Sequence, residues 1–206
     1  MIRLKILLVI FLLVPSSSFA ASPEYEAIEL NNEAVAAQHK LYRWKNHRIV
    51  GSAPNLKDSD YQNIIDKFEA ARKLDPDNDL VRTNLGRAYN NFGLFLGARE
   101  KKWAESIRQL HHAAYLEPGN VTTVQDLDGV IKYGFRMNPN SYAIRTKLGD
   151  QARANKDLFG AVVEYRASLK LKNEAAIHKK LADVYRLLDE KDNAVAEYAA
   201  AYRDAQ

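Results

Sequence analysis

The 206-residue sequence contains no cysteine and no long apolar segment after its first twenty residues. Without cysteine, neither a disulfide nor a thiolate metal site can hold the fold together, and no lipidated cysteine can anchor the chain. Stability must therefore come from packing alone. Only 9 glycines and 6 prolines interrupt a sequence rich in alanine, leucine, lysine and glutamate, and this balance favours helices over a turn-rich β architecture.

The motifs of common catalytic and nucleotide-binding sites are also missing. The sequence has no GxSxG elbow, no GxxxxGK phosphate loop, no GxGxxG fingerprint and no HExxH or HxxxH pair. The neighbours His111 and His112 point about 100° apart on a helix, so we interpret them as partly buried residues of a repeat helix and not as metal ligands. We therefore expect no enzymatic activity, no cofactor and no metal.

The N-terminus has the pattern of a secretory signal peptide. A basic start precedes an apolar run from Ile6 to Val14, which is far shorter than the about 20 residues that span a bilayer, and small residues stand before a cleavage point ahead of Ala21. We expect residues 1–20 to be removed and the mature chain to be periplasmic or secreted, without membrane association. Cleavage takes two of the 30 basic residues and none of the 26 acidic ones, and the remaining charge of +2 gives no indication of nucleic-acid binding.

Two segments near the C-terminus repeat each other at a constant offset. Leu148 aligns with Leu181, and Tyr165 aligns with Tyr198. A period of roughly 33–34 residues, with small residues such as Gly149 at recurring positions, is what repeats of two packed antiparallel helices require. The C-terminal third is therefore predicted to contain two compact helix pairs.

An earlier segment follows the same pattern and carries a family resemblance. Leu85, Gly86 and Tyr89 open it, and Trp103, Ser106, Leu110, Ala113, Leu116 and Pro118 close it. This arrangement resembles the tetratricopeptide repeat (TPR) family, although Arg82, Arg145 and His178 stand where that family has a tryptophan. The resemblance implies an all-α fold, a short TPR-like solenoid of antiparallel helix pairs.

We expect two blocks of two repeats, joined by a lone helix. Both units of the first block carry extra length, a long insertion before Ser59 and eight added residues between Gly86 and Ser106, which we place in the turns within the helix pairs. Between Pro118 and Pro139 there is room for one helix only. The expected ranges are a signal peptide at 1–20, two units with inserted loops at 21–118, a connecting helix at 119–140 and two compact units at 141–206.

In the TPR family, the first helix of each unit lines a concave groove. Carried over to this sequence, the resemblance implies eight partner-binding residues: Asn84, Arg87, Asn90, Lys147, Arg153, Lys179, Lys180 and Arg186. Because most of them are cationic, the groove is expected to bind an acidic or carboxylate-bearing protein or peptide segment through charge-assisted hydrogen bonds. A solvated charged helix face is the alternative interpretation.

These observations favour a non-catalytic interaction scaffold or assembly factor outside the cytoplasm. Two alternatives stay open. In one, the protein binds or processes envelope polysaccharide through the loop around Trp44. In the other, it is a self-assembling structural element, for example a homodimer through a C-terminal helix from about Asn193 to Arg203, where Tyr198 and Tyr202 have no capping helix beside them.

Overall fold

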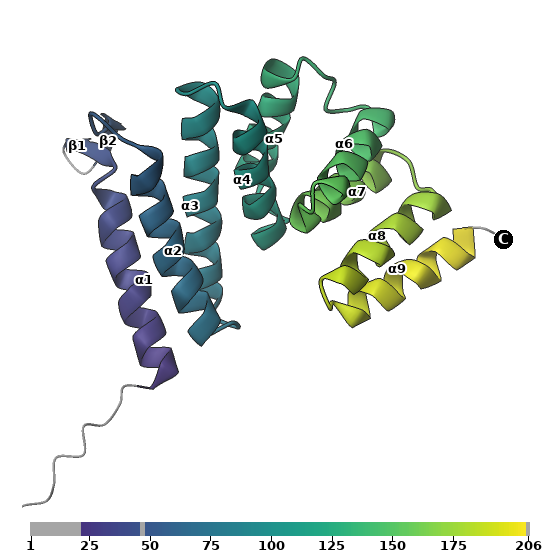
Figure 1. Ribbon diagram of the computed structural model, residues 1–206, viewed down its shortest axis with the longest axis horizontal. Helices are drawn as coiled ribbons and strands as arrows, with labels where there is room; N and C mark the ends of the chain where they lie inside the picture. Colours follow the sequence, from purple (N-terminus) through teal and green to yellow (C-terminus); the bar gives the residue numbers. More distant parts are fainter. Residues whose placement is uncertain (1–21, 46–47, 205–206) are drawn as a thin grey trace, which may run out of the picture.

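The computed structural model describes residues 22–45 and 48–204, and these residues form a stack of antiparallel helix pairs with one small β-hairpin (Figure 1). The elements of the first block are α1 (Pro23–His39), β1 (Tyr42–Lys45), β2 (Arg48–Ser52), α2 (Asp58–Leu74), α3 (Asp79–Ala98) and α4 (Trp103–Leu116). The second block contains α6 (Tyr142–Ala154), α7 (Leu158–Leu171), α8 (Ala175–Leu187) and α9 (Lys191–Asp204). Between the blocks lie α5 (Val121–Gly129) and the π-helical turn η1 (Val130–Gly134).

The pairing of these helices confirms the expected fold class. Helix α1 packs on α2, α3 on α4, α6 on α7 and α8 on α9. Within each block, α2 also packs on α3 and α7 on α8, which connects the two pairs. Among the residues that the structure describes, the segment α5–η1 has no antiparallel partner of its own and packs against α4. The described chain is thus an all-α, TPR-like solenoid with a lone helix between two blocks of two repeats.

Short polar side chains set the starts of several helices. The Asn78 carboxamide accepts hydrogen bonds from two backbone amides of the first turn of α3, and Asn120 and Ser141 do the same once each for α5 and α6. These caps satisfy amides that have no partner inside the helix. They explain why each helix begins directly after the turn that precedes it.

The turn inside a helix pair has the same backbone geometry in three units. Lys101, Lys156 and Asp189 each stand two residues before the second helix of their pair, with φ of 57°, 61° and 59°. This left-handed conformation is unfavourable for residues other than glycine, by roughly 1–2 kcal/mol. Its recurrence shows that the turn is part of the repeat and not an accident of one loop.

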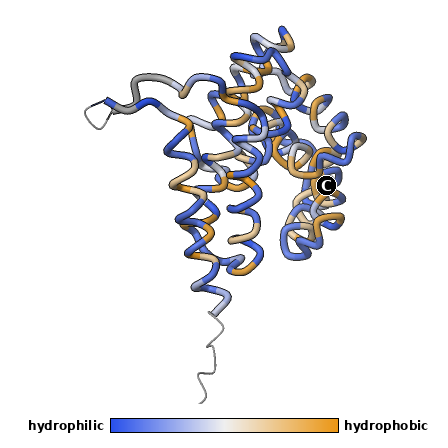
Figure 2. Tube along the Cα trace, turned by 60° about the vertical axis from the view of Figure 1, so that its left-hand side comes forward, coloured by the Kyte–Doolittle hydropathy of each residue, from blue (hydrophilic) through white to orange (hydrophobic). Residues whose placement is uncertain are grey.

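The two insertions of the first block form regular structure instead of loops. The first is the hairpin β1–β2, paired antiparallel from Tyr42 opposite Ser52, and it extends away from the helices (Figure 2). The second lengthens α3, which stays helical to Ala98, so the expectation of an extended turn there is corrected. A salt bridge of 2.7 Å from Lys102 Nζ to Asp58 Oδ2 joins the start of α4 to the start of α2. Both insertions therefore lie at the same edge of the stack (Figure 1).

Each block has its own apolar core, and a third cluster connects them. Phe68 and Leu85 are fully buried in the first block, and Tyr165 and Leu181 in the second. The connecting cluster takes side chains from α4, the lone helix and α6: Leu110, Leu127, Val130, Ile131 and Leu148. The lone helix is thus part of the core and not a loose linker.

Glycines permit the closest helix contacts. A Cβ atom on Gly149 would lie 2.6 Å from the Tyr165 ring, and one on Gly134 would lie 2.7 Å from the Trp103 ring. Both rings belong to a neighbouring helix, so a larger residue at either glycine would force the helices apart.

No helix in the described part of the chain is both long and apolar enough to cross a membrane. The expected signal peptide at 1–20 and its cleavage point before Ala21 lie outside the described residues.

Candidate partner-binding site

Two of the eight predicted partner-binding residues link α3 to its neighbours, α1 and the lone helix α5. Asn84 Nδ2 on α3 donates a hydrogen bond to Asn31 Oδ1 on α1 at 3.0 Å. Further along α3, Asn90 Nδ2 donates to Asp126 Oδ2 on α5 at 2.9 Å. These amides hold α1, α3 and the lone helix in one row.

Two others link the first helices of the C-terminal block. Lys180 Nζ on α8 contacts both carboxylate oxygens of Asp150 on α6, at 2.7 and 2.9 Å. Arg153 Nη2 on α6 lies 3.9 Å from Asp183 Oδ2 on α8. Partial burial alone would raise the pKa of Asp150, but the hydrogen bond and the charge of Lys180 help to hold it below its usual value. These two cations are therefore already balanced within the protein.

The remaining four residues are exposed and cationic. They are Arg87 on α3, Lys147 on α6, and Lys179 and Arg186 on α8. Among the residues that the structure describes, none of them has a carboxylate oxygen within the 4.0 Å of an ion pair. Among the described residues, the row of first helices thus keeps four positive charges without an ion pair, one in the first block and three in the second.

A pocket of about 650 Å³ lies beside Arg87 and Asn90, between α1, α3 and the start of α5. Amide, hydroxyl and ring side chains supply most of its other walls: Gln38, His39, Tyr42, Asn91, Thr122 and Thr123. The Asn90 Oδ1 atom is buried and accepts no hydrogen bond from the described residues. A buried acceptor without a donor destabilises a protein by about 1–3 kcal/mol.

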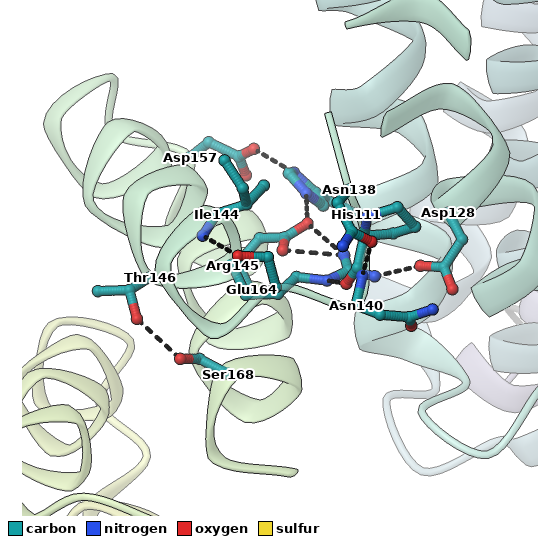
Figure 3. Close-up of polar contacts among 12 residues, drawn as sticks. His111, Asp128, Asn138, Asn140, Ile144, Arg145, Thr146, Asp157, Glu164 and Ser168 are labelled. Carbon is teal, nitrogen blue, oxygen red and sulfur yellow. Dashed lines mark hydrogen bonds and ion pairs between the residues drawn. The ribbon is translucent and has the colours of Figure 1, made fainter. Parts of the chain in front are cut away.

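A second group of polar residues, which was not predicted, connects the two blocks (Figure 3). The His111 ring on α4 lies between two carboxylates, with Nδ1 3.1 Å from Asp157 Oδ2 and Nε2 2.9 Å from Glu164 Oε1. Arg145 on α6 donates to both Glu164 oxygens, at 3.0 and 3.3 Å, and also binds Asp128 on α5. His111, Arg145 and Glu164 are all buried.

The electrostatics of this cluster keep His111 charged. Burial alone lowers the pKa of a histidine, but the hydrogen bonds and negative charges of Asp157 and Glu164 outweigh it and raise the pKa of His111 to about 9. Burial likewise raises the pKa of Asp157, yet pairing with His111 holds it below its usual value. The cluster is therefore a set of charged groups that satisfy one another, as buried charges must. The interpretation of His111 as a partly buried helix residue is accordingly corrected to a fully buried ion-pair partner.

The cluster contains a polar pair that repeats with the sequence. Arg145 contacts Glu164, and at the equivalent positions of the next unit His178 Nδ1 lies 2.5 Å from Glu197 Oε2. Both pairs join the first helix of a unit to the second helix, at the position where the TPR family has a tryptophan. In the earlier unit, Arg82 Nη1 donates to the backbone oxygen of Leu116 at 2.7 Å. Polar contacts thus replace the aromatic packing, and the constant repeat offset was the sequence feature that could have revealed them.

The residues of the two alternative functions occupy opposite ends of the stack. Trp44 lies on β1 opposite Ile49, and its side chain is outside the described part of the structure. On α9, Tyr198 and Tyr202 are exposed, and the Tyr198 hydroxyl donates to Asp183 Oδ1 at 2.6 Å. Within the described residues, no group of three or more histidine, aspartate or glutamate side chains is arranged to hold a metal ion.

No protein-family model and no curated protein sequence matches the chain. Among solved structures, it is similar to the crystal structure of MamA, with a TM-score of 0.34 and 17% identity, over 71% of this chain and 90% of that one. It is also similar to TTC0263, a thermophilic TPR protein of Thermus thermophilus, with a TM-score of 0.33 and 19% identity, over 87% of this chain and 91% of that one. Since these scores are low, the fold assignment rests on the helix pairs themselves.

Proposed function

We propose that the protein is an exported, non-catalytic scaffold that binds a segment of a partner protein along its row of first helices. The observation that supports this most is the charge left on that row. Asn84, Asn90, Arg153 and Lys180 are engaged in contacts within the chain, whereas the four residues without such a partner carboxylate or amide are all cationic. A surface of this kind attracts segments rich in carboxylates and binds them through charge-assisted hydrogen bonds.

The pocket beside Arg87 supports a peptide as the bound group. Its carboxamide and hydroxyl side chains both donate and accept hydrogen bonds, which suits the alternating N–H and C=O groups of a main chain. The guanidinium of Arg87 at the same pocket favours a carboxylate nearby.

Charge reversal tests this proposal. Lys147→Glu combined with Lys179→Glu changes two exposed residues of the row, and it should reduce partner capture by more than about tenfold, because each charged hydrogen bond contributes about 1.5–3 kcal/mol. Capture is measured by crosslinking in the exported fraction of the native host and by quantifying the crosslinked protein. The thermal unfolding midpoint of the variant should stay unchanged.

A matched control distinguishes the effect of charges on the row of first helices from the effect of the net charge of the protein. Lys73→Glu combined with Lys170→Glu makes the same change of charge on the second helices α2 and α7, at two exposed positions. Capture by this control should equal that of the unmodified chain. Equal capture by both double variants contradicts binding along the row of first helices.

Export is tested separately. Fractionation of the native host, followed by sequencing of the N-terminus of the mature protein, should find the chain outside the cytoplasm and beginning at Ala21. A chain that begins at Met1 in the cytoplasm contradicts this part of the proposal.

A further inference from the structure

A larger pocket, of about 880 Å³, lies at the junction between the two blocks. Its walls come from α4, the residue after η1, the second half of α6, the start of α7, and the turns that follow α6 and α8. The apolar side chains among them are Ile107, Phe135, Leu148, Leu158, Phe159 and Leu188. This volume is within the range of about 300–1,000 Å³ that is usual for ligand sites. The pocket is therefore large enough for one or two big apolar side chains.

The break in the solenoid explains why this space is open. Within each block, the second helix of the first pair packs on the first helix of the second pair. These contacts are α2 on α3 and α7 on α8. At the junction, α4 packs on the lone helix and on α7, while α6 lies to one side. Side chains of both α4 and α6, Ile107 and Leu148 among them, therefore line the pocket.

The walls are held rigidly before any ligand arrives. On one side, His111 is fixed between Asp157 and Glu164. Next to it, the His112 ring lies 4.8 Å from the Tyr89 ring and 5.0 Å from the Phe159 ring, measured between centroids. Burial lowers the pKa of His112, so this ring carries no charge at neutral pH. Rigid walls lose little entropy when a ligand binds.

The mouth of the pocket is positively charged. Arg108 and Lys156 line it and are exposed, and among the described residues no carboxylate oxygen lies within 4.0 Å of the charged nitrogens of either. The one carboxylate of the lining is Asp157, whose oxygens are bound to His111 and to the Gly160 amide. An apolar interior with cations at the rim is complementary to a ligand with an apolar body and a negative flank.

We propose that the junction pocket anchors the partner by one aromatic or large aliphatic side chain that is flanked by acidic residues. This inference rests on the proposed function, since it assigns the same partner a second contact. A peptide segment is the occupant because the pocket adjoins the cationic row on α6, where Lys147 stands one helical turn before the exposed Gln151 of the pocket wall. A segment that follows the row therefore reaches the pocket without leaving the surface.

Peptide selection identifies the chemistry of the occupant. Random twelve-residue peptides displayed on phage are panned against the full mature chain. Enriched peptides should contain an aromatic or large aliphatic residue with aspartate or glutamate within two positions. Enrichment of basic or purely polar peptides, or no enrichment, overturns the proposal.

Variants of the pocket then locate the binding. An enriched peptide is synthesised with a fluorophore, and its affinity is measured by anisotropy. Ala104→Trp fills the pocket from an exposed position, and Arg108→Glu with Lys156→Glu reverses the rim; each should weaken binding at least tenfold. Ala143→Trp, at an exposed residue of α6 outside the lining, should leave the affinity unchanged.

The same peptide separates this inference from the function on which it rests. If Lys147→Glu with Lys179→Glu abolishes binding while the pocket variants do not change it, the junction pocket is not an anchor site, and the row of first helices alone binds the partner. If dodecanoate binds the chain in a manner that Ala104→Trp prevents, while no peptide is enriched, the pocket takes a small amphiphile and the peptide proposal is overturned. Loss of binding only in the pocket variants supports the anchor and overturns the role of the row.

Discussion

Replacing Glu164 by glutamine removes the central negative charge of the block junction and keeps the shape of the side chain. Glu164 is completely buried and contacts two cations, with His111 Nε2 at 2.9 Å and Arg145 Nη1 at 3.0 Å. A glutamine oxygen at the Oε1 position still reaches both cations, but glutamine carries no negative charge, and its amide group then faces the Arg145 donor that Glu164 Oε2 accepts from at 3.0 Å. Breaking a buried ion pair destabilises a protein by about 3–5 kcal/mol. We expect a value near the lower end of this range, because Asp157 still pairs with His111 and Asp128 still pairs with Arg145.

The sequence repeat supplies a matched control for this variant. Glu197 is the equivalent of Glu164 in the next unit and pairs with His178, but its side chain is 24% exposed and water can replace the lost contact. Pairs in contact with solvent contribute about 0–1 kcal/mol. We therefore expect Glu164→Gln to lower the free energy of unfolding by about 2–4 kcal/mol more than Glu197→Gln.

Urea unfolding of the mature chain, followed by far-ultraviolet circular dichroism at pH 7, measures this difference. Because the contact between α4 and α7 is the main one between the blocks, Glu164→Gln should also separate one transition into two. Equal losses of stability in the two variants, or a loss below about 1 kcal/mol for Glu164→Gln, would show that the buried charges do not hold the junction.

Two further predictions concern the same units. Because the pKa of His111 is raised from 6.5 to about 9, its stabilising effect is complete below pH 6.5 and is lost as the pH rises through 9. The free energy of unfolding should therefore fall by about 1 kcal/mol per pH unit between pH 7 and 9. The variant His111→Gln should not show this decrease. Gly149→Ala should destabilise the chain by about 1–3 kcal/mol in the same urea assay, since its Cβ would lie 2.6 Å from the buried Tyr165 ring, and an unchanged or raised stability would contradict that contact.

The repeating helix pairs were predictable because their pattern is local. The apolar residues of one helix, the turn that follows and the constant repeat offset all lie within short stretches of sequence. Local patterns were also the source of an error in the second unit, where we placed the eight added residues between Gly86 and Ser106 in a turn. This stretch contains Gly93 and Gly97. Both lie inside α3, because each allows the helix to approach α4, at Leu110 for Gly93 and at Ser106 for Gly97. In the sequence alone, a glycine in a turn cannot be distinguished from a glycine at a close contact between two helices.

The site was only partly predictable for a related reason. The family resemblance selected residues on the first helices, but it carried no information on which of them are already paired. Likewise, His111 is 46 residues from Asp157 and 53 residues from Glu164. His111 belongs to the first block, whereas both partners belong to the second. Helix periodicity does not specify how one block is oriented on the next, so contacts across the junction required the three-dimensional structure.

In the described chain, most contacts join helices that are one or two positions apart in chain order. The contact of α4 with α7 spans a longer distance in the sequence, and together with the connecting apolar cluster it joins the two blocks. A pulling force applied at the two ends of the molecule would therefore pass through this contact and its buried charges. The attraction in a hydrogen-bonded ion pair weakens steeply with separation and with entry of water. Under tension, the two blocks should thus separate abruptly at this contact while each block stays folded. The protein should not extend evenly along its length.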